Sequence, residues 1–293
     1  MIRRILLLPH IKVINANALS SPFTIGFPAV TACMGAVHAL QRQLNENSFS
    51  KVEFIGSGII SHGITLRTYK DEAGYISSII GSGHPLKKDG NRRSFIEEAK
   101  CHLEVSLLIE FNSLEKDREE FFVTLISKLL HSSIKFAGGD ITDFMQPQLY
   151  RVEDGNKAEL TKVLRKLMPG YVLIDRHELM VDAMKEGRDA IDALIDYLAV
   201  HNSSELDSNG EISWSSHRKV PGWIVPIATG FQGISKIQAA ANQRNQNVPH
   251  RFAESIITLG EFRMLHRVNS LDEILWKFET DLENNLYQCA QCK

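Results

Sequence analysis

The first half of the chain alternates between β-rich runs and amphipathic helices, and this order constrains the fold more than any other feature. A buried-strand pattern, "IRRILLLPHIKVI" (2–14), precedes a helical pattern that begins at Phe27. Two β-rich runs follow at 51–69 and 100–111, and 115–136 carries a second amphipathic helix. One further strand would complete the split βαβ arrangement of a ferredoxin-like domain. The sequence therefore predicts an α+β protein with a ferredoxin-like (RRM-like) core.

Residues 156–210 carry helical periodicity without a strand pattern, so the sequence predicts a helical insertion there. The core then consists of 1–155 and 211–293. The insertion is acidic, because 111–210 carry 12 lysines and arginines against 18 acidic residues. The residues of its predicted acidic stripe are Asp182, Glu186, Asp189 and Asp196. Such a stripe faces solvent or a basic protein partner, because it would repel a nucleic-acid backbone.

The last part of the chain is expected to contain one strand and two helices. The strand pattern "GWIVPIATGFQGI" (222–234) is followed by a polar stretch at 242–252 and then by a predicted helix. Within 270–283, Ser270 and Glu273 have capping-box spacing and precede apolar residues at helical intervals. The sequence therefore predicts that 270–283 is a closing helix.

The composition favours a cytoplasmic protein without membrane contact. Pro9, His10 and Lys12 interrupt the apolar N-terminal run, which argues against a signal peptide. No stretch approaches the roughly 18 apolar residues that a membrane span requires. The four cysteines form no framework of the secreted type.

Motifs for metal or cofactor chemistry are incomplete. The stretch "HELMV" has Val181 where a zinc-protease motif requires a second histidine. The C-terminal pair in "CAQC" has no second pair to complete a structural zinc site. The glycine clusters match neither the P-loop nor the dinucleotide fingerprint. The sequence predicts no cofactor and no metal.

The stretch "NANALSSPFTIGFPAV" (15–30) joins the first strand to the first helix and has two interpretations. Asn, Ser and Pro are the residues of turns and caps. The same stretch presents amides, hydroxyls and backbone N–H groups at a helix N-terminus, where the helix dipole favours phosphate. On these residues alone, turn formation is favoured and phosphate binding is the alternative.

Two further segments carry cations that could contact nucleic-acid phosphates. The loop at 81–94 is the most basic short window, with Lys87, Lys88, Arg92 and Arg93. A second segment interleaves arginines with aromatic side chains, a pattern that can pair and stack with single-stranded RNA. Its members are Arg244, His250, Arg251, Phe252, Phe262, Arg263, His266 and Arg267. A solvated loop tip and a solvated face are the alternatives.

Four stretches together resemble one protein family. They are "LLLPHIKVINANALSSPFTIGFPAVTACMGAVHAL" (6–40), "EEAKCHLEVSLLIEF" (97–111), "PGWIVPIATGFQGIS" (221–235) and "HRFAESIITLGEFRMLHRV" (250–268). In this order they are similar to the Cas-five-like subunit of type I-F CRISPR surveillance complexes, the second protein of the Csy set. The resemblance covers most of the chain and is least specific in the helical middle and the last twenty residues.

The resemblance implies a repeat-associated RNA-binding fold and a non-catalytic role. Such a subunit grips the 5′ handle of the CRISPR RNA, pairs with the large subunit and abuts the last copy of the backbone subunit. The resemblance leaves open a contact with target double-stranded DNA near the protospacer-adjacent motif. The basic loop would fold over the RNA like a thumb. The RNA-binding residues expected on this basis are Asn15, Asn17, Ser20, Ser21, Lys87, Lys88, Arg92, Arg93, Phe231, Gln232, Arg251, Arg263, His266 and Arg267.

Two other classes of function stay open at this point. A metal-independent endonuclease that processes CRISPR RNA on the same fold would use His62, His84 or His266 as its general base. A purely structural scaffold would contact only protein. The net charge of −2 further predicts that the isolated chain binds RNA poorly and needs the large subunit for stable capture.

Overall fold

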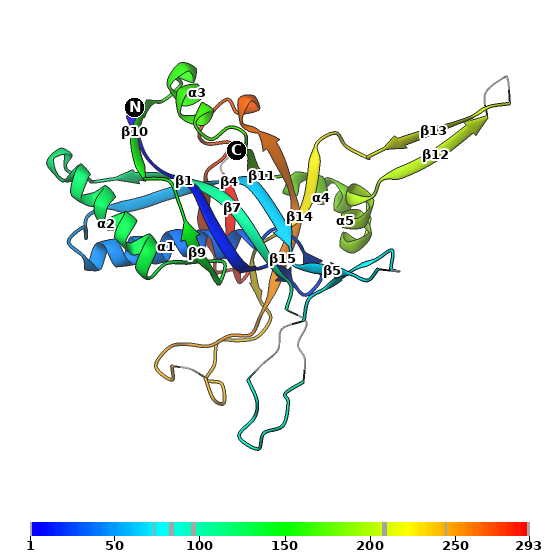
Figure 1. The fold of residues 1–293 in the computed structure, drawn as a ribbon, viewed down its shortest axis with the longest axis horizontal. Coiled ribbons are helices and arrows are strands. Elements are labelled where there is room, and N and C mark those ends of the chain that lie inside the picture. Colours follow the sequence, from blue (N-terminus) through cyan, green and yellow to red (C-terminus); the bar gives the residue numbers. More distant parts are fainter. Residues whose placement is uncertain are drawn as a thin grey trace.

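A computed structural model describes residues 2–72, 74–81, 85–94, 98–206, 210–243 and 245–291. These residues fold around an eleven-stranded antiparallel sheet with helices packed against it (Figure 1). The strands of the sheet are β1 (Ile2–Asn17), β4 (Glu53–Leu66), β7 (Lys100–Asn112), β8 (Lys135–Phe136), β9 (Gly139–Asp143), β10 (Gln148–Glu153), β11 (Tyr171–Asp175), β14 (Trp223–Gly233), β15 (Ala253–Met264), β16 (Trp276–Asp281) and β17 (Leu286–Gln291). The helices are α1 (Val30–Glu46), α2 (Glu119–Ser132), α3 (Lys157–Arg165), α4 (His177–Lys185) and α5 (Ala190–Leu198), with short 3-10 turns at Lys116–Arg118 and Leu265–Arg267. The expected α+β class is confirmed.

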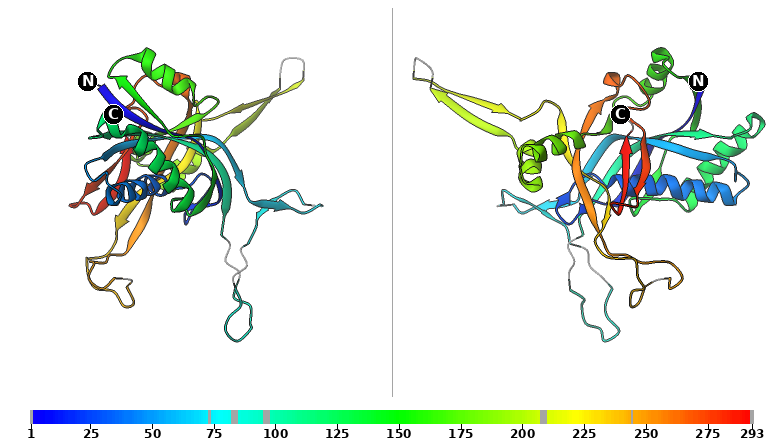
Figure 2. Two further views of the ribbon diagram at one scale, coloured as in Figure 1. Left: turned by 60° about the vertical axis from the view of Figure 1, so that its left-hand side comes forward. Right: turned by 180° about the vertical axis from the view of Figure 1, so that it is seen from behind.

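Three two-stranded hairpins lie outside the large sheet in the part of the chain that the structure describes. They are β2 (Leu19–Ser21) with β3 (Thr24–Ile25), β5 (Thr68–Lys70) with β6 (Ser77–Ile79), and β12 (His201–Leu206) with β13 (Ile212–His217). The last of these hairpins extends far from the body (Figure 2). We refer to residues 201–217 as the arm.

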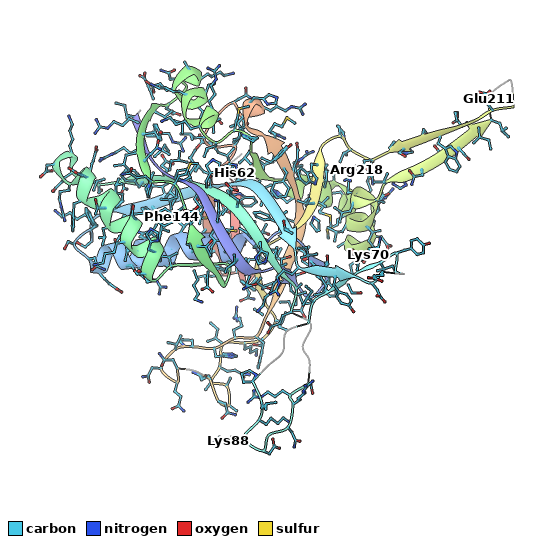
Figure 3. The ribbon with its side chains drawn as sticks, in the orientation of Figure 1. His62, Lys70, Lys88, Phe144, Glu211 and Arg218 are labelled. Carbon is cyan, nitrogen blue, oxygen red and sulfur yellow. The ribbon has the colours of Figure 1, made fainter. Side chains whose placement is uncertain are left out.

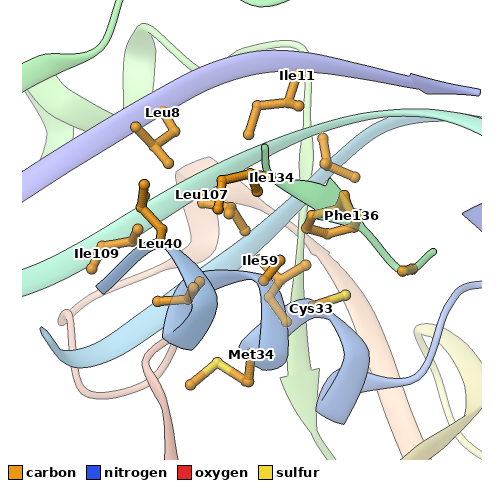
Figure 4. Packing of buried hydrophobic residues seen from close by; sticks show 14 of the residues in the cluster. Leu8, Ile11, Cys33, Met34, Leu40, Ile59, Leu107, Ile109, Ile134 and Phe136 are labelled. Atoms are coloured by element: carbon orange, nitrogen blue, oxygen red, sulfur yellow. The ribbon is translucent and has the colours of Figure 1, made fainter. Parts of the chain in front are cut away.

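The first half of the chain forms the strand order β9-β1-β7-β4, with α1 and α2 packed on one face. The predicted N-terminal strand, the two β-rich runs and the two amphipathic helices are all confirmed. β1 is apolar on both sides because both of its faces are covered: Leu6 and Leu8 pack with α1 and α2, and Ile5 and Leu7 pack with α3. Burying each of these four side chains contributes about 1.5–3 kcal/mol. Figure 4 shows the layer between α1 and the sheet.

The C-terminal strands close back on the first half through β4. One edge of β4 pairs with β7 along its whole length. Its other edge pairs with β16 at Ser57 and with β11 at Ile60 and Ser61. Since β11, β15, β14, β17 and β16 are paired in that order, these five strands and β4 form a closed circuit.

The prediction of a closing helix over 270–283 is wrong. Residues 271–274 form a bend followed by a turn, and β16 begins at Trp276. Of the apolar residues with helical spacing, Leu271, Ile274 and Leu275 are buried, whereas Phe278 and Leu282 are exposed. The indole N–H of Trp276 donates to the carbonyl oxygen of Leu173 at 3.0 Å. A fully buried tryptophan with a satisfied N–H stabilises this strand more than local helix propensity could stabilise a helix.

Two further secondary-structure predictions are also wrong. The segment after 252 is the strand β15 rather than a helix, since the sheet provides pairing partners on both sides in β11 and β14. The segment 156–210 contains three helices, but it also contains β11, which belongs to the main sheet. The boundaries of an insertion at 156 and 210 stay a prediction.

Two long loops project from the same side of the body (Figures 1 and 2). One joins β6 to β7 and includes the cations of residues 85–94, which we call the basic loop. The other joins β14 to β15 over 234–252, which we call the polar loop. No helix among the described residues has the length and apolar character needed to cross a membrane.

Candidate nucleic-acid interface

The loop after β1 lies against the base of the segment that carries the basic loop. The N–H of Ala18 donates to the carbonyl oxygen of Ala99 at 2.8 Å, just before β7. Arg67 donates from Nη1 to Asn15 Oδ1 at 2.8 Å, and its own N–H donates to Lys100 O at 2.8 Å. The structure therefore brings the predicted residues of the first loop next to the start of β7, the strand into which the predicted basic loop leads.

Asn15 occupies an irregular position in β1. The register between β1 and β7 shifts between Val13 and Ala16, and Asn15 has a φ of 56°. Asparagine tolerates this left-handed conformation better than most residues with a side chain. Because its side-chain oxygen accepts from Arg67, Asn15 fixes a cation at the base of the basic loop. Sequence reasoning missed Arg67, since only the pairing of distant strands places it there.

The other polar residues of the first loop hold a tight turn. The side chain of Asn17 donates to Leu19 O at 3.1 Å and accepts from Leu19 N–H at 3.0 Å. The hydroxyls of Ser20 and Ser21 both lie within 2.8 Å of Thr24 Oγ1, at 2.8 and 2.6 Å. Ser21 is buried and Asn17 is exposed. These contacts support turn formation for the serines and leave the amide of Asn17 at the surface.

The cations of the basic loop lie at the surface of the protein. Lys87, Lys88, Arg92 and Arg93 are exposed, and none of them forms an ion pair with another described residue. Figure 3 shows Lys88 far from the body. The lone acid of the loop, Asp89, accepts from the backbone and side-chain N–H groups of Asn91, and these hydrogen bonds lower the pKa of Asp89. The tip is therefore an ordered turn with an excess of positive charge.

Phe231, Gln232 and Arg251 lie where β14 and β15 meet the polar loop. Phe231 and Gln232 pair with Tyr287 and Leu286 of β17, and Phe231 is partly exposed. The stem of Arg251 lies across Gly233, where an added Cβ would be 2.3 Å from Arg251 Cδ. Its guanidinium donates to the side-chain oxygen of Asn285. Because glycine at 233 leaves room for it, the Arg251 side chain lies against the sheet surface.

Three predicted residues lie elsewhere. Arg263, His266 and Arg267 follow at the other end of β15, about 40 Å from Arg251 at roughly 3.3 Å per residue. Arg263 donates to both carboxylate oxygens of the buried Glu261, which also accepts from Arg176. Burial opposes ionisation of Glu261, but the hydrogen bonds from the two arginines lower its pKa overall. The predicted basic and aromatic segment from Arg244 to Arg267 therefore does not form one cluster, and Arg244 itself lies outside the described residues.

Of the histidine candidates for a general base, His62 has both ring nitrogens engaged within the protein. His62 Nδ1 lies 2.8 Å from the carbonyl oxygen of Pro169, and its Nε2 lies 2.6 Å from the hydroxyl of Ser106. Because the carbonyl only accepts, Nδ1 carries the proton, and Ser106 donates to Nε2. Burial lowers the pKa of His62, which keeps the ring neutral. His84 lies outside the described residues, and His266 is exposed in a 3-10 turn.

Other titratable groups give no metal centre within the described ranges. No group of three or more His, Cys, Asp or Glu side chains there could hold a metal ion. The described cysteines Cys33, Cys101 and Cys289 are buried, and burial raises the pKa of Cys101 to about 11 and of Cys289 to about 12. Buried thiols of this kind are protonated at neutral pH and pack as small apolar groups.

Comparison with known proteins decides the family. A family model described as "CRISPR-associated protein (Cas_Csy2)" matches residues 6–289. The chain belongs to the Csy2 family. It is 29% identical to the CRISPR-associated protein Csy2 of Pseudomonas aeruginosa (strain UCBPP-PA14) over 312 residues, which cover 97% of this chain and 94% of that protein. The family that the four sequence stretches predicted is confirmed, and the chain is a subunit of a type I-F Csy complex.

Proposed function

We propose that this Csy2-family chain is a non-catalytic subunit that binds the 5′ handle of the CRISPR RNA through the side of the body from which the basic loop and the polar loop project. The observation that carries the proposal is the set of four exposed cations of the basic loop, which leads into the start of β7 where Arg67 and the first loop make their contacts. Lysine and arginine contact phosphates without reading sequence. Handle-specific contacts then fall to amides and aromatic rings nearby.

Asn15, Asn17, Phe231, Gln232 and Arg251 are the proposed handle contacts beyond the basic loop. Phe231 offers a partly exposed ring at the base of the polar loop, and stacking on such a ring is how single-stranded bases are commonly held. Ser20 and Ser21 act in this proposal by holding the turn that places Asn17. The predicted contacts of Arg263, His266 and Arg267 stay a prediction, and they would form a separate site.

We also propose that the first half is a ferredoxin-like, RRM-like domain. The element order β1, α1, β4, β7, α2, β9 is the βαββαβ order of that fold. Counted along the chain, β1, β4, β7 and β9 are the first to fourth strands of this series. They lie in the antiparallel sheet in the order fourth, first, third, second. In this arrangement the basic loop extends from the connection between the second and third strands, β4 and β7.

Within the complex, the proposal gives the chain three partners: the handle, the large subunit and the terminal copy of the backbone subunit. The subunit then caps one end of the backbone in the cytoplasm. A contact with target double-stranded DNA near the protospacer-adjacent motif stays a prediction. The proposal includes that the isolated chain binds RNA weakly, because its net charge of −2 offsets the local charge of the basic loop.

The test is co-expression with the large subunit and a guide RNA, followed by gel-shift titration of the 5′ handle at several salt concentrations. Changing Lys87, Lys88, Arg92 and Arg93 to alanine should make the salt dependence shallower by a slope of about 3, at roughly 0.7 per phosphate contact. The matched control changes Lys51, Lys116, Lys128 and Lys162 to alanine, since these exposed lysines lie away from the proposed interface.

An unchanged slope in the basic-loop variant, or an equal change in the control, would contradict handle binding at this side. Incubation of the purified complex with repeat RNA tests the endonuclease alternative in the same experiment. Intact RNA is the expected result. Cleaved repeat RNA that depends on this chain would make it the nuclease instead.

A further inference from the structure

The arm is a free-standing β-hairpin. β12 and β13 pair with each other from His201 with His217 to Leu206 with Ile212, and neither strand pairs with the main sheet. Figure 3 labels Glu211 near its outer end and Arg218 close to its root. A two-stranded hairpin is at best marginally stable in water without a third strand or a packing surface. Contact with a partner surface in the assembled state would therefore stabilise the arm.

The two faces of the arm differ in chemistry. Residues directly opposite each other share a face, and so do residues two apart on one strand. The pairs of Leu206 with Ile212 and of Ser204 with Trp214 therefore lie on one face. The exposed fractions of Leu206, Ile212 and Trp214 are 73%, 61% and 74%, so the described protein does not cover this face.

The opposite face is polar and internally bonded. It carries Ser203 and Ser215, whose hydroxyls are 2.6 Å apart, and the stacked rings of His201 and His217, whose centroids are 5.4 Å apart. Glu205 lies on this face as well. An alternation of apolar and polar residues is typical of a strand with one buried face, yet no described part of this chain covers the apolar face.

The root of the arm is anchored to the body. Asp196 of α5 accepts from Arg188 at 2.5 Å and from Lys219 at 2.5 Å, and His201 Nε2 lies 3.6 Å from its other oxygen. The hydrogen bond from Lys219 is the main cause that lowers the pKa of Asp196. The ammonium of Lys219 also lies 4.2 Å from the ring centroid of Tyr197. These contacts join α5 to His201 at the start of the hairpin and to Lys219 just after its end. They fix the direction in which the arm leaves the body.

The charge of the arm selects the class of partner. Residues 201–217 contain three acidic residues and no lysine or arginine. An acidic hairpin is repelled by nucleic-acid phosphates and by anionic lipid headgroups, and it is attracted to a basic protein surface. Tryptophan in a central desolvated position is among the residues that most often dominate the energy of a protein interface.

We propose that the apolar face of the arm, formed by Leu206, Ile212 and Trp214, docks into an apolar groove edged by lysine or arginine on another protein subunit of the same complex. This inference rests on the complex membership that the family establishes, and it does not depend on handle binding. The arm then acts as a protein-docking element, whereas the basic loop contacts RNA.

The decisive experiment places p-benzoylphenylalanine at Trp214, or at Ser215 on the opposite face, in the co-expressed complex with labelled guide RNA. The expected result is a crosslink from position 214 to another protein subunit, at least several-fold stronger than from position 215. A crosslink from 214 to RNA, equal protein crosslinks from both positions, or no protein crosslink from 214 would overturn the proposal.

A second measurement uses the triple variant L206S/I212S/W214S, with S203A/S215A as the matched control on the polar face. The triple variant should lower the fraction of this chain that co-purifies with the partner subunit at least 10-fold, and the control should not. Thermal unfolding of both variants should match that of the unmodified chain, because the substituted side chains lie on a hairpin that pairs with no strand of the main sheet. Equal co-purification of both variants would contradict the docking role.

The two proposals fail independently in these experiments. If the basic-loop variant retains the salt dependence of handle binding while position 214 still crosslinks to protein, only the handle proposal falls. If the basic-loop variant loses handle affinity while position 214 gives no protein crosslink, only the docking proposal falls.

Discussion

The basic loop and the arm both project from the body, but their chemistry is opposite. The described residues of the basic loop carry four exposed cations and one acid, whereas the arm has an apolar face and only acidic charges. The basic loop has little regular structure, and the arm is a regular hairpin with two distinct faces. The fact that a segment extends from the body therefore does not tell which class of partner it binds. Charge and the distribution of apolar residues separate a phosphate contact from a protein contact.

The largest expected effect comes from reversing the charge of the basic loop. Changing Lys87, Lys88, Arg92 and Arg93 to glutamate should weaken handle binding by at least 100-fold, since four attractive phosphate contacts become repulsive. The crosslink from position 214 of the arm should persist in this variant. If both the protein crosslink and RNA binding are lost, the basic loop and the arm are not separate in function.

The next test compares two tryptophans, one in the body and one in the arm. Trp276→Ala should lower the free energy of unfolding by about 3–5 kcal/mol, because it empties a fully buried site and removes the hydrogen bond to Leu173. Trp214→Ala should change it by less than about 0.5 kcal/mol, as is usual for an exposed side chain. Urea denaturation measures both. A large loss for Trp214→Ala would mean that the arm is packed on the body in solution.

A smaller effect is expected at the base of the polar loop. Gly233→Ala would place a Cβ 2.3 Å from Arg251 Cδ, so the arginine side chain must move. We expect handle affinity to fall a few-fold with little loss of stability, because a flexible side chain can yield. Gly230→Ala is the contrasting variant, since its Cβ would be 2.4 Å from the backbone oxygen of Tyr287 and should destabilise the pairing of β14 with β17. Unchanged handle binding in the Gly233 variant would remove Arg251 from the interface.

The smallest effect is a pH dependence that arises in the body rather than in either projection. Burial lowers the pKa of His62 in the folded state, so the unfolded chain binds a proton more readily. The contribution to stability is present above the unfolded pKa of about 6.5 and is lost as the pH falls through the folded pKa. His62→Gln should flatten the stability profile below about pH 6.5 in urea titrations. An identical profile in this variant would exclude His62 as the source.

Sequence patterns predicted the first half of the fold well because its apolar periodicities are local and agree with the final packing. The "ILLLP" run, the helix predicted from Phe27 and the helix within 115–136 all have strong patterns of their own, although α1 begins three residues later, at Val30. The pattern at 270–283 was equally strong but misleading, because Trp276 is placed by the distant carbonyl of Leu173. Helical and strand burial can both satisfy a short apolar pattern, and only the tertiary partner decides between them.

The candidate interface was predictable only where its residues are neighbours in the sequence. The cations of the basic loop are adjacent in sequence and could be recognised together, whereas Arg67 joins Asn15 across 52 residues and gave no sequence signal. Arg251 and Arg263 are close in sequence, but an extended strand separates them. The apolar face of the arm was hidden because the surrounding segment has mostly helical periodicity.

The closed circuit on β4 has a consequence for how the chain is made. The open edge of β4 is covered at Ser57 by Trp276, a residue from near the end of the described chain. During synthesis the first half therefore leaves the ribosome with an unpaired strand edge, which is a site for wrong pairing and aggregation. That edge is completed only when the last hairpin, β16 with β17, has been made and docked. A partner subunit that binds the nascent N-terminal half leaves this edge open unless it covers β4 itself. Assembly of the complex after the C-terminal strands have folded avoids that exposure.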